Sequence, residues 1–144
     1  MYCIDASVLT NSVISKEEFH EYSKRLLTVI KEHEIMVVVP EIVLPEIASA
    51  ISRGTGDPYR AIAFASKIRQ LPNFIFIPLD SGLADSSSKF AAIYGLRGCD
   101  SIYVAVASLF NAKLVSLDKQ QRKRALECIE ALTPMEELKN IGEM

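Results

Sequence analysis

An apolar stretch with an acid near each end constrains the fold of this chain more than any other feature. Residues 98–118 read GCDSIYVAVASLFNAKLVSLD, where an apolar run over 102–110 precedes a short, alternating run over 114–117 that includes the β-branched Val115. The first run predicts a helix over about residues 99–111 and the second predicts a strand, with a tight turn between them. Such a helix rises by about 20 Å and a five-residue strand by about 17 Å, so the chain returns close to its starting level. We therefore expect Asp100 and Asp118 to lie near each other.

The composition predicts one globular domain over residues 1–144. The chain is 49% hydrophobic and 24% charged, and no apolar run reaches the ~18 residues that a membrane span requires. The N-terminus has no basic leader, so we expect a cytoplasmic protein without a secretory signal. Three cysteines without CxxC spacing argue against a disulfide framework and a zinc site. The net charge of −2 gives no global attraction to nucleic acid, so such binding would need a local basic patch.

Strands and helices are expected to alternate along the chain, which predicts an α/β domain with a mainly parallel sheet. A capping-box pattern at Ser15 and Glu18 starts the first predicted helix, and Gly95 ends the fourth. The predicted strands are 2–5, 35–39, 74–77, 114–117 and a short edge strand at 129–132. The predicted helices are 16–34, 41–52, 58–70, 81–94, 99–111 and 119–127, with a terminal helical turn at 135–141. Residues 6 and 7 are expected to open a loop.

Four acids are expected to meet at one edge of this sheet. Ligand sites of open parallel sheets lie outside the carboxyl ends of the strands. Asp5 and Asp118 each follow a strand, Asp100 begins the helix beside them, and Glu46 lies about one turn into the helix after the second strand. Carboxylates this close raise one another's pKa, and a divalent cation would remove the repulsion. Oxygen donors without a nearby histidine or cysteine suit Mg²⁺ or Mn²⁺.

Each acid also has a plainer interpretation when it is considered alone. Asp100 suits the first turn of a helix because of the helix macrodipole, and Asp118 suits the N-cap of the next helix. Glu41 competes with Glu46 for the role in the second helix. Asp5 is the hardest to explain without a partner, because an acid that ends a buried strand is costly.

The residues around these acids resemble a PIN-domain ribonuclease, and most of all the VapC-type toxin nucleases. The matching pieces are Ile4-Asp5-Ala6-Ser7, Glu46, Tyr94-Gly95-Leu96-Arg97 before Asp100, Leu114-Val115-Ser116-Leu117-Asp118, and the tail Thr133-Pro134-Met135-Glu136-Glu137. The resemblance covers nearly the whole chain. It implies five parallel strands in the order 3-2-1-4-5 and one or two Mg²⁺ or Mn²⁺ ions.

In the resemblance, Asp5, Glu46, Asp100 and Asp118 take the acidic, metal-binding positions. Ser7 and Ser116 take the supporting hydroxyl positions. The expected reaction is metal-assisted hydrolysis of RNA phosphodiester bonds. VapC-like proteins usually dimerise and bind a small antitoxin, so a homodimer and an antitoxin partner are implied as well.

A basic segment follows the last acid and could hold the RNA backbone. Four cations fall within six positions there, and Arg97 could help from the other side of the site. The segment residues are Lys119, Arg122, Lys123 and Arg124. The alternative for each side chain is a solvated helix face. The helical hairpin at 41–70 carries six large apolar residues, which predict a homodimer face: Ile42, Ile47, Ile51, Ile62, Phe64 and Ile68.

Three other functions remain as alternatives. A haloacid dehalogenase phosphatase needs Asp-x-Asp after the first strand, but Ser7 stands in the second place. A phosphoreceiver signalling domain could use Asp80 as its acceptor, but the acidic pair after the first strand is missing. A non-catalytic PIN-like domain that binds RNA or a partner protein would keep the same fold.

Overall fold

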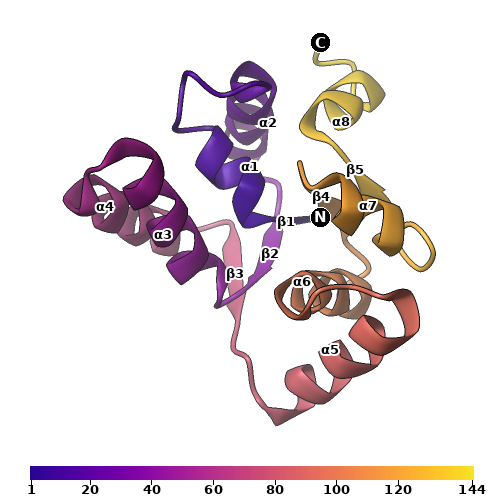
Figure 1. Ribbon diagram of the computed structural model, residues 1–144. Helices are drawn as coiled ribbons and strands as arrows, with labels where there is room; N and C mark the ends of the chain where they lie inside the picture. Colours follow the sequence, from indigo (N-terminus) through magenta and orange to yellow (C-terminus); the bar gives the residue numbers. More distant parts are fainter.

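Five parallel strands in the order β3-β2-β1-β4-β5 form the sheet at the centre of the computed structural model, which describes residues 1–144 (Figure 1). The strands are β1 (Tyr2–Ile4), β2 (Val37–Pro40), β3 (Phe74–Ile77), β4 (Lys113–Val115) and β5 (Ala131–Leu132). Every neighbouring pair is parallel. The predicted α/β class, the parallel sheet and its strand order are therefore confirmed.

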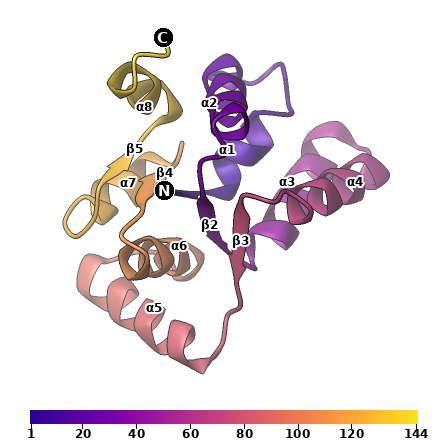
Figure 2. The same cartoon turned by 180° about the vertical axis from the view of Figure 1, so that it is seen from behind.

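The central strands are short and apolar because helices cover both faces of the sheet. All residues of β1 and β2 are buried, as expected for strands of a covered parallel sheet. Helix α6 (Gly98–Leu109) packs against β1, β2 and β4. Figures 1 and 2 show α6 on one side of the sheet, with α1 (Ala6–Asn11) and α2 (His20–Glu32) on the other. The stretch that follows Gly98 thus forms the predicted helix, turn and strand.

Capping residues set the limits of the remaining helices as expected. The Asp57 and Asp80 side chains accept hydrogen bonds from the first turns of α4 and α5. Gly56 and Gly95 end α3 and α5 in the left-handed conformation that glycine adopts without strain. These helices are α3 (Val43–Thr55), α4 (Pro58–Arg69), α5 (Ser81–Tyr94), α7 (Lys119–Ala125) and α8 (Pro134–Asn140). None of the helices has the length and apolar character needed to cross a lipid bilayer.

The first predicted helix begins too early. Helix α2 starts at His20 rather than Lys16, and the expected capping box of Ser15 and Glu18 does not form. Instead, the Asn11 amide donates to the Glu18 carbonyl at 2.8 Å, and Phe19 adopts a left-handed φ of 67° that interrupts any helix. The short helix α1, where a loop was predicted, holds this segment in place.

The helical hairpin forms, but it leaves less apolar surface than predicted. Ile47, Ile51 and Ile68 are buried, and Ile42 and Phe64 pack against the same core. Of the six predicted residues only Ile62 is largely exposed, at 62%. The apolar residues of the hairpin therefore mostly serve the core of the protein, and the homodimer stays a prediction.

Candidate active site

An open pocket of about 630 Å³ at the carboxyl ends of β1 and β4 brings the four predicted acids together. The backbone N–H of Asp5 donates to the carbonyl of Val115 at 3.0 Å, so the two strand ends are neighbours here. The strand order reverses between β1 and β4, which is where parallel sheets form ligand sites. The charged residues that line the pocket are Asp5, Glu17, Glu46, Asp100, Asp118, Arg53 and Arg97. Acids outnumber cations by three.

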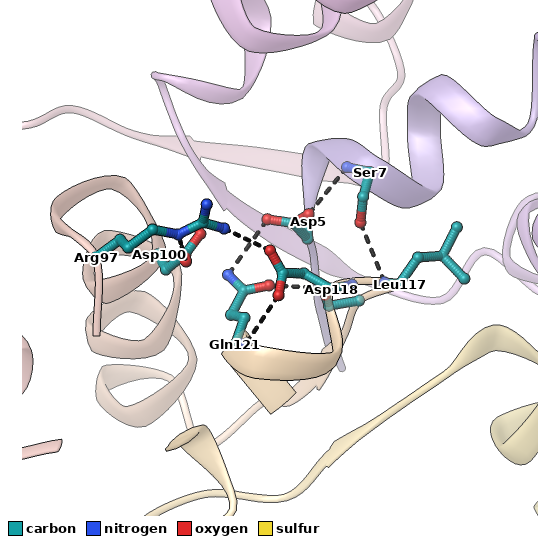
Figure 3. A network of polar contacts seen from close by, with 8 residues as sticks. Asp5, Ser7, Arg97, Asp100, Leu117, Asp118 and Gln121 are labelled. Carbon is teal, nitrogen blue, oxygen red and sulfur yellow. Dashed lines mark hydrogen bonds and ion pairs between the residues drawn. The ribbon is translucent and has the colours of Figure 1, made fainter. Parts of the chain in front are cut away.

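Asp5 is held firmly at the end of β1. Its carboxylate caps α1 by accepting from the backbone N–H of Ser7 at 2.9 Å. Its other oxygen accepts from the side-chain amide of Gln121 at 3.3 Å (Figure 3). The side chain is buried, and these two donors offset the cost of burying a carboxylate.

A small hydrogen-bond network fixes the loop that carries Asp118. Asp118 caps α7 by accepting from the backbone N–H of Gln121 at 3.0 Å. The Ser116 hydroxyl accepts from the Asp118 N–H at 3.0 Å and donates to the Gln121 side chain at 2.6 Å. The Ser7 hydroxyl accepts from the Leu117 N–H at 3.1 Å (Figure 3). Both serines therefore contact the loop between β4 and α7, and Gln121 joins Asp5 to Ser116.

Arg97 bridges Asp100 and Asp118. Its Nε donates to Asp100 at 2.9 Å and its Nη2 donates to Asp118 at 2.5 Å, so the guanidinium lies between the two carboxylates (Figure 3). The two acids are thus neighbours, as the helix, turn and strand predicted. The repulsion expected between them is offset by a cation that belongs to the chain itself.

Glu46 is half-buried and is held by a buried tyrosine. The Tyr103 hydroxyl, on α6, donates to Glu46 at 2.5 Å. Burial raises the pKa of the Glu46 carboxyl, the Tyr103 hydrogen bond opposes this, and the charges of Asp5 and Asp100 add to it. Burial also raises the pKa of Asp100, against the lowering effect of Arg97. The acids are therefore close enough for their charges to interact.

The sequence model of the PIN domain family matches residues 2–126. The chain belongs to the PIN domain family. This confirms the resemblance to PIN-domain proteins that was drawn from the sequence. No curated protein matches the sequence significantly.

Several solved structures of other proteins share the fold at low sequence identity. Mycobacterium tuberculosis VapC20, described as a sarcin–ricin loop cleaving toxin, has a TM-score of 0.73 and 17% identity, covering 85% of this chain and 94% of its own. PAE2754 from Pyrobaculum aerophilum has a TM-score of 0.69 and 19% identity, covering 99% and 96%. A chain of a toxin–antitoxin complex from Klebsiella pneumoniae has a TM-score of 0.66 and 17% identity, covering 93% and 98%. At these identities the likeness concerns the fold.

The lining of this PIN domain pocket suits a hard divalent cation by its chemistry. Its acidic groups are all carboxylates, and no histidine or cysteine lines it. As the side chains stand, no three of these groups converge closely enough to hold one ion. Asp100 and Asp118 are engaged by Arg97, and Glu46 by Tyr103. An ion held by Asp100 and Asp118 would have to displace the Arg97 guanidinium from these two carboxylates.

The predicted basic patch of the PIN domain is divided between two sides of the site. Arg124 lines a recess that also includes Arg97, Asp100 and Asp118. Arg122 turns the other way and donates to the Ser116 carbonyl at 2.9 Å. Lys119 and Lys123 are exposed and make no ion pair.

Asp80 lies apart from the acidic pocket. It caps α5 by accepting from the Leu83 N–H at 2.8 Å, and it follows β3 at the edge of the sheet. It is absent from the pocket lining. A phosphoreceiver site would need this residue among the central acids, so the structure argues against that alternative.

We predict that replacing Glu46 with Gln stabilises the metal-free PIN domain at neutral pH. The raised pKa of Glu46 means that the unfolded state releases this proton at lower pH than the folded state. The contribution of Glu46 to the unfolding free energy is therefore greatest below the ordinary pKa of glutamic acid. It decreases as the pH rises toward neutrality and the buried carboxyl has to lose its proton. Thermal melts should give a higher Tm for the variant at pH 7 and an equal Tm near pH 4.

Glu41→Gln is the matched control, and its Tm at pH 7 should change in the opposite direction. Glu41 accepts two hydrogen bonds from Arg69, at 2.7 and 2.6 Å, and these lower its pKa. Its removal should lower the Tm at pH 7 and have little effect at pH 3. Equal behaviour of the two variants would contradict the electrostatic description of the pocket.

Proposed function

We propose that this PIN domain is a metal-dependent endoribonuclease and acts in the cytoplasm as the toxin of a toxin–antitoxin pair. The observation that carries the proposal is the convergence of Asp5, Glu46, Asp100 and Asp118 on one open pocket of the PIN fold. VapC20 is described as a cleaving toxin, and the Klebsiella protein was solved as a toxin–antitoxin complex. These descriptions support an RNA substrate and a small antitoxin partner for this chain.

The chain's own groups divide the work in the proposed reaction. Asp5, Asp100 and Asp118 would hold Mg²⁺ or Mn²⁺, and Glu46 would bind a second ion or orient the attacking water. When bound, such an ion activates water and offsets the charge that develops on the phosphate. Gln121 and the two serines hold Asp5 and Asp118 in position by the hydrogen bonds described above.

Arg97 has a second role in this proposal. Once its guanidinium leaves Asp100 and Asp118, it can contact the RNA backbone, as can Arg124 on the neighbouring helix. Lys119 and Lys123, both exposed on α7, extend this basic surface. Arg122 donates to the Ser116 carbonyl in the loop after β4 and belongs to the other side of the site.

A non-catalytic PIN domain that binds RNA or a partner protein is the second candidate. The ion pairs of Arg97 favour it, because they fill the place that an ion needs. Purified protein incubated with mixed RNAs decides between the two. Cleavage that requires Mg²⁺ or Mn²⁺ and stops with chelator supports the nuclease. Intact RNA in the presence of either ion supports the binding domain.

Replacing Arg97 with Ala is expected to lower the Tm of the metal-free protein and to increase its gain in Tm on adding Mg²⁺ severalfold. The variant loses the counter-ion of Asp100 and Asp118, so an added ion no longer competes with a guanidinium. Thermal melts over a Mg²⁺ titration measure both effects. Arg53→Ala is the control, because Arg53 lines the same pocket but makes no ion pair. An equal response of both variants would contradict competition between Arg97 and the ion.

A further inference from the structure

A second, smaller recess lies directly beside the acidic pocket. It has a volume of about 170 Å³ and is formed by α2, the loop after β4, α7 and the start of α8. Leu117 lines both this recess and the acidic pocket. We call it the aromatic recess, because Phe19 and Tyr22 are among its lining residues. A group bound there would be next to anything held at the four acids.

Phe19, which lines the recess, has an unfavourable backbone conformation. Its φ of 67° lies in the left-handed region, which is uncommon for a bulky side chain. The residue is 47% exposed, and it gives α2 no side-chain cap. Neither core packing nor helix capping therefore explains a phenylalanine here. Strained residues of this kind gather at ligand sites, where the strain is part of the function.

The lining of the recess also includes a hydrogen-bond donor and a hydrogen-bond acceptor. Arg122 is a hydrogen-bond donor, already anchored on the Ser116 carbonyl at 2.9 Å. Glu136 is an acceptor, and a single oxygen, Oε2, takes both bonds from Thr133, at 2.7 and 3.0 Å. Its Oε1 makes no hydrogen bond to the protein. A planar ring with donors and acceptors along its edge could accept a hydrogen bond from Arg122 and donate one to Glu136.

We propose that the aromatic recess binds one unpaired nucleobase of the RNA, next to the phosphodiester that the acids cleave; this rests on the proposed ribonuclease function. Its volume is below that of pockets for drug-sized ligands and suits a single ring system. Aromatic side chains stack on any base, and the Arg122 charge favours an anionic chain. In this proposal Phe19 and Tyr22 contact the substrate.

Phe19→Gly tests the proposal with little risk of unfolding. Glycine adopts the required φ without strain, so the variant should melt at the same or a higher temperature. Its affinity for labelled single-stranded RNA should fall about tenfold, the typical effect of losing one base–aromatic stack. Fluorescence anisotropy with Mg²⁺ present, in the Asp100→Asn background that keeps the RNA intact, measures this.

Two controls separate the recess from general effects. Asn111→Gly removes a side chain from another left-handed position, with φ 51°, and Ile62→Ala removes an exposed apolar side chain from α4. Neither should change RNA affinity. An abasic nucleotide moved through the RNA should weaken binding of the Asp100→Asn protein at one position. In the Phe19→Gly, Asp100→Asn double variant, an abasic nucleotide at that position should no longer weaken RNA binding.

The outcomes distinguish this proposal from the proposed function. Unchanged RNA affinity in Phe19→Gly would overturn the base site and leave the recess to another occupant, such as a protein partner. RNA that binds with the abasic pattern but is never cleaved by the unaltered protein would support the base site and contradict the nuclease. No RNA binding at all would overturn both.

Discussion

Replacing Asp100 with Asn is expected to lower kcat/KM for RNA cleavage by about a thousandfold or more. The carboxylate lies at the start of α6 and faces Asp118 across the Arg97 guanidinium. In the proposed reaction its charge holds the ion that supplies several kcal/mol of stabilisation to the transition state, and each ~1.4 kcal/mol is a factor of ten in rate. Steady-state cleavage of a labelled RNA with Mg²⁺ or Mn²⁺ measures the loss.

Asp80→Asn is the matched control for that experiment. Asp80 also follows a strand and caps a helix, but it lies outside the pocket. Its replacement should leave cleavage within about twofold of the unaltered rate, because such an exposed change stays within ~0.5 kcal/mol. Full activity in Asp100→Asn, or an equal loss in both variants, would remove Asp100 from the site.

The second large effect is expected from Gln121→Leu. Gln121 is 1% exposed and its side chain links Asp5 to Ser116. Leucine has a similar size but cannot donate or accept, so a buried carboxylate and a buried hydroxyl lose a partner. We expect a loss of about 2–3 kcal/mol in unfolding free energy, measured by urea denaturation. Cleavage should fall by about 10–100-fold, as for other groups that orient metal ligands.

Gln120→Leu makes the same chemical change one residue earlier. Gln120 is exposed and makes no side-chain hydrogen bond to the site network. It should retain unfolding free energy to within about 0.5 kcal/mol. If the two variants proved equally stable and equally active, Gln121 would have no positioning role.

Local pattern was enough to predict a parallel sheet and the meeting of the acids, whereas the strand order came from the resemblance to PIN-domain ribonucleases. The run from Gly98 to Asp118 contains a helix and a returning strand of similar length, so Asp100 and Asp118 had to end on one edge. Asp5 and Glu46 followed from the same rule about strand ends. Each of these inferences needs only residues close in sequence and the parallel arrangement of the strands.

The partners of these acids could not be predicted, because they depend on contacts between distant segments. Tyr103 reads as a core residue of α6, and Gln121 as a polar residue on an exposed helix. Only the fold brings them to Glu46 and Asp5. Arg97 looked like an RNA contact, yet its guanidinium spans two carboxylates. The predicted start of α2 was wrong for a similar reason, because the Asn11 side chain binds the Glu18 carbonyl just before Phe19.

The most direct test of the account follows bound metal and RNA cleavage in one sample. Metal-free protein is titrated with Mn²⁺, bound ion is measured by electron paramagnetic resonance, and cleavage of a labelled RNA is recorded at each step. We predict that cleavage is absent without the ion and rises in proportion to the occupancy of the site, and that Asp118→Asn shows neither the binding nor the activity. Cleavage that persists in chelated protein, or binding that Asp118→Asn leaves unchanged, would contradict a metal site at these four acids.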